Sequence, residues 1–185
     1  MKKRFGKSDW LDLGLTQLAK DGPAGLTIEA LCSAAGRTRG SFYHHFKDHG
    51  AFVEALMLAW KQRHTLNLVD QTLAEESALR TRKLSDLANG LDHRLERAVR
   101  RFAQSDRQAQ EIVRDVDDLR TGFIAQLYEI GGLAPALAAD VAKIEYAAFV
   151  GSQIVWPDMP AEDRAALDRR FAQLVAMATV AGSET

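Results

Sequence analysis

The sequence predicts an all-α fold, and three observations carry that prediction. Residues that favour helix, above all Ala, Leu, Arg, Gln and Glu, dominate the 185-residue chain, whereas proline occurs only four times. Apolar residues recur at helical spacing along most of the chain, and no run alternates β-branched and polar residues over the length of a strand. Capping residues and glycines divide this pattern into successive helices.

The first helix is expected over residues 7–22, in the sequence KSDWLDLGLTQLAKDG. Ser8 or Asp9 can cap its N-terminus, and Gly22 ends it. Gly14 lies in its middle, where glycine costs stability relative to alanine, so we expect another helix to approach closely at this point.

The next three helices are each marked by a capping residue that hydrogen-bonds the free N–H groups of the first turn. These caps are Thr27 for the helix over 26–36, Thr38 for a short helix over 37–46, and Asp48 for a long helix over 51–73. Four further helices are expected over 84–104, 109–132, 136–156 and 160–182. We therefore predict a head domain over residues 1–48 and a larger helical domain over residues 49–185.

Charge is unevenly distributed between these two parts. Residues 1–50 carry eight Lys or Arg and five Asp or Glu, although the whole chain has a net charge of −1. A basic head on a mildly acidic body predicts an anionic partner for the head alone, and a chance imbalance is the alternative. No segment has the apolar length of a membrane span or of a signal-peptide core, so we expect a cytoplasmic protein without a membrane partner.

The single cysteine excludes an intrachain disulfide. Cys32 falls on the apolar stripe of the second helix, so we expect a small core residue, with a redox switch as the alternative. No nucleophile elbow, phosphate-binding loop or metal-ligand motif occurs, which argues against an enzyme, a cofactor or a metal site.

The stretch GRTRGSFYHHF, residues 36–46, carries the functional prediction. Phe42 and Phe46 are four residues apart and can share the inner face of a short helix, while the polar residues face outward. A helix, a tight glycine turn and a second short helix that is polar on the outside form a helix-turn-helix, here over about residues 27–46, whose second helix enters the major groove of double-stranded DNA.

The chain resembles the TetR family of bacterial transcription regulators over roughly its first third. The matching positions are Gly14, Leu18, Ala19, Thr27, Ile28, Leu31, Ala35, Gly36, Thr38, Gly40, Ser41, Phe42, Tyr43, His45 and Phe46. This resemblance implies an all-α homodimer with a C-terminal ligand-binding domain. It also implies that the last two helices of each subunit form a four-helix dimer interface.

Nine residues are expected to contact DNA, by phosphate or base contacts: Thr27, Arg37, Thr38, Arg39, Gly40, Ser41, Tyr43, His44 and Lys47. Arg37 stands where the family often has a small apolar residue, and a solvated arginine is an equal alternative. His49 stands where the family usually has a phosphate-binding lysine, so that contact is expected to be weaker or pH-dependent. The basic residues at positions 2–4 and Lys7 can form a minor-groove arm or a solvated tail.

Two further sets of residues are predicted in the larger domain. The expected effector-binding residues are Trp60, Arg63, His64, Phe102, Phe123 and Tyr146, with plain core as the alternative. The expected dimer interface contains Ala147, Gly151, Ile154, Leu167, Phe171 and Leu174, with internal core as the alternative. Few charges lie among the aromatic residues, which predicts a mostly hydrophobic small-molecule effector.

The sequence therefore predicts a homodimeric regulator, most simply a repressor that a small molecule releases from a pseudo-palindromic operator. A different class of protein is the alternative, namely a helical ligand-binding or interaction protein whose head has lost specific DNA binding. The replacement at His49 and the modest charge of the head favour that alternative.

Overall fold

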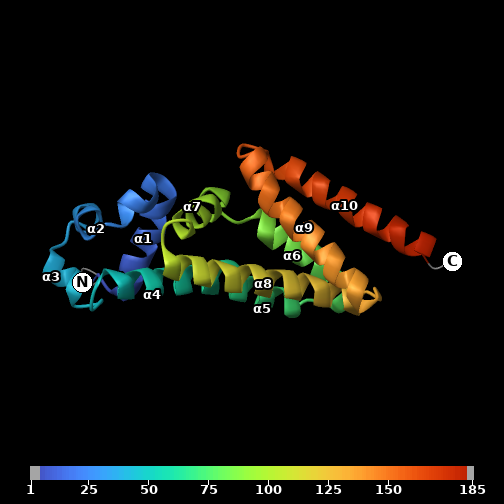
Figure 1. Cartoon of the computed structure of the whole chain (residues 1–185), viewed down its shortest axis with the longest axis horizontal. Helices are drawn as coiled ribbons and strands as arrows, with labels where there is room; N and C mark the ends of the chain where they lie inside the picture. The colour runs from blue at the N-terminus through green and yellow to red at the C-terminus, as the bar shows by residue number, and fades with distance from the viewer. Residues whose placement is uncertain (1–4, 183–185) are drawn as a thin grey trace. The chain divides into compact units, whose positions relative to one another are not determined.

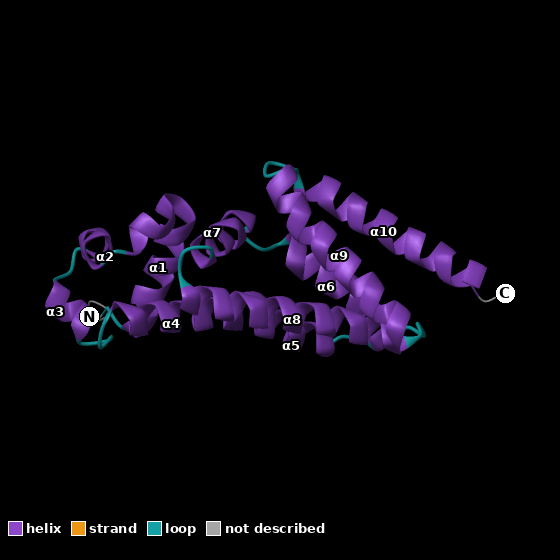
Figure 2. Ribbon diagram, in the orientation of Figure 1, coloured by secondary structure: helices purple, strands orange, loops and turns teal. Residues whose placement is uncertain are grey.

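A computed structural model describes residues 5–182 of the chain, with side chains through residue 177, and every regular element in this part is helical (Figures 1 and 2). The ten α-helices of this part are α1 (Lys7–Asp21), α2 (Ile28–Ala35), α3 (Arg39–Tyr43), α4 (His49–Lys61), α5 (Asn67–Leu73), α6 (Arg80–Asn89), α7 (His93–Ala103), α8 (Arg107–Ile130), α9 (Pro135–Val155) and α10 (Ala161–Gly182). Two short 3₁₀ segments, Gly22–Leu26 and Ser77–Leu79, and a π-helical segment, Gln62–Leu66, complete the described structure. The all-α prediction is confirmed.

The chain divides into two compact units, each described here by itself. Unit 1 contains Met1–His64 and Asp92–Val116, and unit 2 contains Thr65–Leu91 and Asp117–Thr185. Unit 1 therefore contains the first four helices together with α7 and the first part of α8. The segment between these two parts, Thr65–Leu91, belongs to unit 2. The predicted boundary at residue 48, between the head domain and the larger helical domain, stays a prediction.

Aromatic rings form the centre of unit 1. Trp10 of α1, Phe42 of α3 and Phe52 of α4 have no exposed surface, and the ring centroids of Trp10 and Phe42, and of Phe42 and Phe52, are each 5.4 Å apart. A methyl group on Gly14 would lie 2.8 Å from side-chain atoms of both Phe52 and Leu56. The predicted close approach at Gly14 is therefore confirmed, and the approaching helix is α4.

Three details of the predicted helices were wrong. The N-cap of α1 is Gly6 and not Ser8 or Asp9: Gly6 N–H donates to Asp9 Oδ2 at 2.7 Å, so Asp9 lies inside the first turn of the helix. The expected helix over 84–104 is two helices, because Asp92 caps α7 with a hydrogen bond from Arg94 N. The long helix over 51–73 is interrupted by the π-helical segment Gln62–Leu66, called the π-turn below.

Unit 2 has few buried apolar side chains. Among its described residues these are Leu68, Phe123, Leu127, Ala138 and Ala142. Polar contacts connect its helices: Tyr128 Oη of α8 donates to Glu145 Oε2 of α9 at 2.6 Å, and Ser85 of α6 donates to Asp168 of α10. None of the helices in the described part of the chain is both long and apolar enough to span a membrane.

Candidate nucleic-acid interface

Helices α2 and α3 form the helix-turn-helix, and local hydrogen bonds fix the turn between them. Gly36 ends α2 in the left-handed region at φ 59°, a conformation that glycine adopts at no steric cost. Thr27 Oγ1 accepts from Ala30 N at 3.2 Å, and Thr38 Oγ1 accepts from Ser41 N at 3.3 Å. Both predicted threonine caps are therefore confirmed, and they set where each helix begins.

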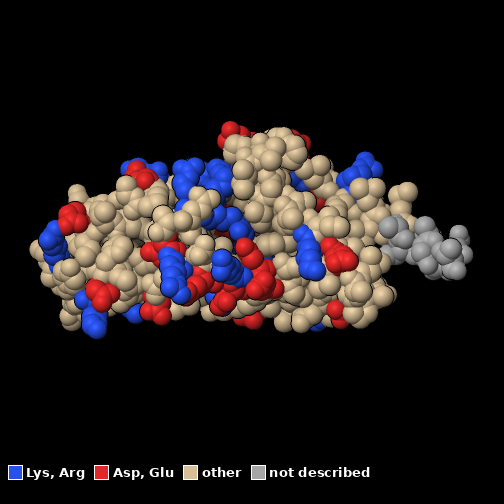
Figure 3. Space-filling view, viewed as in Figure 1, with Lys and Arg blue, Asp and Glu red and all other residues tan. Residues whose placement is uncertain are grey.

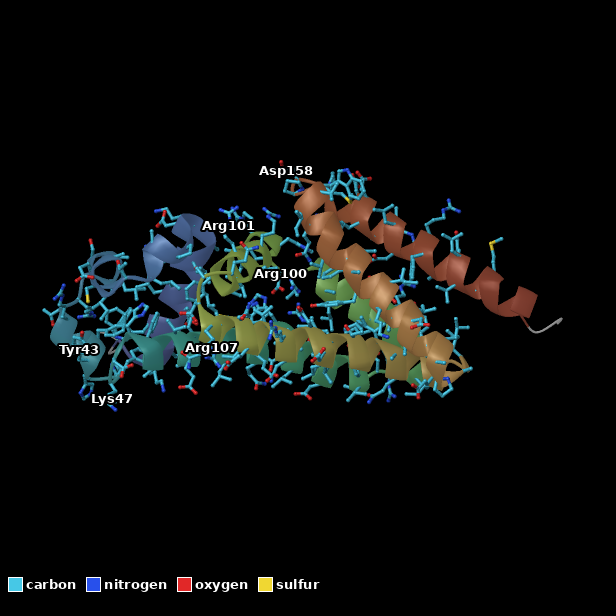
Figure 4. All side chains as sticks on the ribbon, in the orientation of Figure 1. Tyr43, Lys47, Arg100, Arg101, Arg107 and Asp158 are labelled. Carbon is cyan, nitrogen blue, oxygen red and sulfur yellow. The ribbon has the colours of Figure 1, made fainter. Side chains whose placement is uncertain are left out.

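Helix α3 is anchored from its inner face. Phe42 is fully buried and Phe46, just past the helix, is 3% exposed, whereas Tyr43 is 50% exposed. The Tyr43 ring packs edge-on against Phe42 at a centroid distance of 5.6 Å, which leaves its hydroxyl free to reach outward. Tyr43 and Lys47 lie at the α3 end of unit 1 (Figure 4).

All nine residues expected to contact DNA are accessible, and the structure places them together at this end of unit 1. Ser41 is half-buried and the other eight are exposed. Basic and acidic side chains are interspersed on the face shown in Figure 3. The predicted contact set contains three cationic side chains, Arg37, Arg39 and Lys47, which are exposed and available for phosphate contacts.

Two arginines of the interface already have partners in the free protein. Arg39 of α3 forms an ion pair with Glu29 of α2, and both side chains are about two-thirds exposed. The Arg37 guanidinium lies 5.5 Å from the centroid of the Phe5 ring. The first contact places a carboxylate at the surface that a phosphate or base edge would approach, a feature that sequence reasoning missed.

His49 turns back toward the protein. Its Nε2 lies 2.9 Å from the carbonyl oxygen of Leu26, the residue just before the Thr27 cap. As a donor to that carbonyl, Nε2 carries the ring proton. The residue that replaces the family's usual lysine therefore holds the start of α2 in place. The proposed arm at positions 2–4 lies outside the described residues, and Lys7 Nζ lies 5.6 Å from the Phe46 ring centroid.

Comparison with known proteins supports this arrangement. The sequence profile of "Bacterial regulatory proteins, tetR family" matches residues 11–56, which include most of α1, the helix-turn-helix and the first part of α4. The match covers about a quarter of the chain, so it identifies the N-terminal helices as a domain of the kind this family has. The matched residues contain the helix-turn-helix that α2 and α3 form. No match was found among curated proteins.

Solved structures of similar fold extend over most of the chain. One, described as a transcriptional regulator of the TetR/AcrR family, has a TM-score of 0.71 at 17% identity and covers 89% of this chain and 97% of its own. A TetR-family regulator from Rhodococcus sp. has a TM-score of 0.67 at 16% identity, covering 92% and 96%. A transcriptional regulator from Pseudomonas aeruginosa PAO1 has a TM-score of 0.66 at 16% identity, covering 91% and 89%.

The six residues expected to bind an effector are divided between the two units, four in unit 1 and two in unit 2. Trp60 and Phe102 belong to the packed core of unit 1, while Arg63 and His64 line a pocket of the same unit. The other two lie in unit 2, where Phe123 is buried and Tyr146 Oη donates to Asp117 Oδ1 at 2.6 Å. Their role in effector binding stays a prediction.

The residues expected at a dimer interface lie on α9 and α10, and most of them are exposed. Ile154, Leu167 and Leu174 are 64%, 48% and 56% exposed, Ala147 is also exposed, and Gly151 and Phe171 are half-buried. Such a run of accessible apolar side chains is typical of a surface that another chain covers.

A buried carboxylate beside the π-turn was also not predicted from the sequence. Glu96 of α7 is 1% exposed, accepts a hydrogen bond from Trp60 Nε1 at 2.8 Å, and has Oε1 3.1 Å from His64 Nδ1. On the other side of the turn, Arg120 Nε donates to Thr65 Oγ1 at 2.9 Å within unit 2. The sequence did hold a signal, since Glu96 falls on the apolar stripe of its helix.

Proposed function

We propose that this protein is a repressor of the tetR family that binds double-stranded DNA through α3. The observation that carries the proposal is the two-sided character of α3: Phe42 fixes it to the core while Arg39, Tyr43 and His44 face outward. Tyr43, Lys47 and the Thr27 cap contact phosphates, and Arg39 and His44 read base edges. The protein acts on DNA in the cytoplasm and carries out no catalysis.

The repressor acts as a homodimer. The exposed apolar residues of α9 and α10 support this, because a second copy would remove them from water. Two α3 helices of a dimer can occupy successive major grooves about 34–36 Å apart, which predicts an operator with inverted half-sites.

A small-molecule effector binds unit 2 and releases the DNA. The small number of buried apolar side chains in this unit supports an interior that a ligand completes. Tyr128 with Glu145, and Tyr146 with Asp117, form half-buried hydrogen-bonded pairs in this unit, so we expect an effector with a mostly apolar body and groups that can hydrogen-bond. An effector acts only through its different affinities for the DNA-competent and released conformations.

The π-turn supplies a route from unit 2 to the head. It connects α4, which packs against α1 in the head, to α5 in unit 2. Contacts hold it on both sides, with Glu96 beside Trp60 and His64, and Arg120 bonded to Thr65. π-Helical segments within α-helices occur frequently at functional sites. A rearrangement of this turn would change the orientation of α4.

The test is selection of binding sites from random duplex DNA by the purified protein at fixed, near-physiological salt. Enrichment of an inverted repeat is expected. With the selected site, Tyr43→Phe should weaken binding to all sequences, whereas Arg39→Ala or His44→Ala should relax preference at particular base pairs. If Tyr43→Phe binds as tightly as the unsubstituted protein, our placement of α3 on the backbone is wrong.

A ligand-binding protein that has lost specific DNA binding is the second candidate. Two observations favour it: the His49 ring is held by the Leu26 carbonyl oxygen, and Arg39 is already paired with Glu29. This candidate predicts binding that falls steeply with salt and enriches no sequence. Repeating the selection with cell extract distinguishes it from a regulator that needs its effector in order to bind.

A further inference from the structure

Two cationic side chains of the head lie over aromatic rings at the two ends of α3. The Arg37 guanidinium is 5.5 Å from the centroid of the Phe5 ring, and Lys7 Nζ is 5.6 Å from the centroid of the Phe46 ring. Arg37 precedes α3 in the sequence, and Phe46 follows it. Both distances fall within the ~6 Å over which an aromatic ring attracts a cation. The rings therefore restrict where the two charges lie.

The two rings belong to one continuous row. Phe5 packs edge-on against Trp10, with the ring centroids 5.1 Å apart. Trp10 packs edge-on against Phe42 at 5.4 Å, and the Phe42 centroid lies 5.2 Å from that of Phe46. Trp10 and Phe42 have no exposed surface. These four residues, called the ring row below, connect both cations to the side chain that anchors α3.

Both cations keep their charge for an outside partner. The side chains of Arg37 and Lys7 are exposed, and within the described part of the chain neither forms an ion pair with a carboxylate, in contrast to Arg39. An aromatic ring attracts a cation through its face and carries no net charge, so the N–H donors of both groups stay free. An anion can therefore bind either cation without breaking its contact with the ring.

The place of these cations beside α3 favours DNA phosphates as that anion. A helix in the major groove has a sugar-phosphate backbone on each side, and cationic side chains around the helix make most contacts to it. Lys47 follows Phe46 directly and is already expected to make such a contact (Figure 4). A cation that a ring already restricts also loses less side-chain entropy when it binds.

We propose that the ring row orients Arg37 and Lys7 as two phosphate contacts, one at each end of α3, and that Phe5 is a positioning residue for Arg37. The inference rests on the DNA-binding role proposed for α3 and deepens it. It adds Lys7, at the start of α1, to the surface that contacts DNA. The two contacts fix how α3 lies in the groove and carry no base preference.

Fluorescence anisotropy with the selected duplex, and with a duplex of scrambled sequence, measures the salt dependence of binding. Between about 50 and 200 mM salt, the slope of log affinity against log salt should decrease in magnitude by about 0.9 per subunit in Arg37→Ala, and equally in Lys7→Ala. Each substitution should weaken binding to both duplexes by the same factor, because phosphate contacts carry no sequence information. The matched control is Lys20→Ala, which removes an exposed lysine from the other end of α1 and should leave the slope unchanged.

A double-mutant cycle tests the role of Phe5. Phe5→Leu keeps an apolar side chain against Trp10 but removes the ring beside Arg37, and should weaken binding about two- to fivefold. The same substitution made in Arg37→Ala should have no further effect. If Phe5 served only to stabilise the fold, Phe5→Leu would weaken binding equally in both backgrounds, and that result would overturn its positioning role.

The outcomes separate this inference from the proposal for α3. If Tyr43→Phe weakens binding while Arg37→Ala or Lys7→Ala leaves the slope unchanged, the paired phosphate contacts are wrong and the role of α3 stands. If Lys20→Ala lowers the slope as much as the other two, general charge is responsible and the pair is again wrong. If the protein binds neither duplex at low salt, with or without cell extract, both proposals are overturned.

Discussion

At the scale of single residues, the ion pair between Arg39 and Glu29 has the most direct bearing on DNA binding. The Glu29 carboxylate both occupies Arg39 and repels approaching phosphates. We therefore expect Glu29→Gln to raise affinity for the selected DNA site about two- to tenfold at low salt, measured by fluorescence anisotropy. Glu54→Gln, at an exposed position of α4, makes the same charge change without releasing an arginine. An equal gain in Glu54→Gln would show that general charge, and not Arg39, is responsible.

A second residue-scale prediction concerns pH. Burial raises the pKa of Glu145 above its ordinary value of 4.5, and nearby Asp168 raises it further, while the hydrogen bond from Tyr128 acts in the opposite direction. The folded protein therefore takes up a proton above pH 4.5 that the unfolded chain does not, so this group stabilises the fold increasingly as pH falls. The free energy of unfolding, measured by urea denaturation relative to Glu145→Gln, should rise from pH 8 to pH 5. If the difference in free energy of unfolding between the two proteins did not change with pH, the raised pKa of Glu145 would be contradicted.

At the scale of elements, alanine substitutions at two glycines within helices should change the free energy of unfolding in opposite directions. Gly14→Ala places a methyl group 2.8 Å from Phe52 and Leu56 in the α1–α4 contact, and should lower the free energy of unfolding by about 1–3 kcal/mol. Gly122→Ala in α8 meets no atom within 4 Å, and should raise it by up to about 1 kcal/mol. Thermal and urea unfolding followed by circular dichroism measure both. A neutral Gly14→Ala would mean that the packing at α4 relaxes without cost.

The elements also show what sequence could and could not predict. Thr27, Thr38 and Gly36 act through bonds and torsions within a few residues, so the helix-turn-helix was predictable. Residues of the π-turn contact Glu96 and Arg120, which lie far away in sequence, and no local sequence pattern predicts the π-helical segment. The break between α6 and α7 was not predicted for another reason. Leucines continue at helical spacing across Gly90, which indicated one continuous helix although Asp92 is a good capping residue. The pocket in unit 1 could not be predicted, because its lining comes from three segments that are separate in the sequence.

At the scale of the whole molecule, the exposed apolar faces of α9 and α10 make dimerisation testable. Leu167→Glu places a charge in the proposed interface, and should convert the dimer to a monomer that binds the inverted repeat at least tenfold more weakly. Leu79→Glu is the matched control, because Leu79 has the same exposed fraction, 48%, and lies outside α9 and α10. Sedimentation velocity measures the oligomeric state. Two variants that both remain dimers would place the interface elsewhere.

The discontinuity of unit 1 has a consequence for biosynthesis. The chain leaves this unit at His64 and re-enters it at Asp92, and α7 then supplies Leu95, Val99 and Phe102 to the same core as Trp10 and Trp60. During translation the head therefore emerges from the ribosome long before the residues that complete its core. Its apolar surface stays open until residues through Val116 have been made, which is the interval in which a nascent chain is most exposed to misfolding and to chaperones. A fragment that ends at residue 64 would make this state permanent, so the DNA-binding head should require the return segment to be stable in isolation.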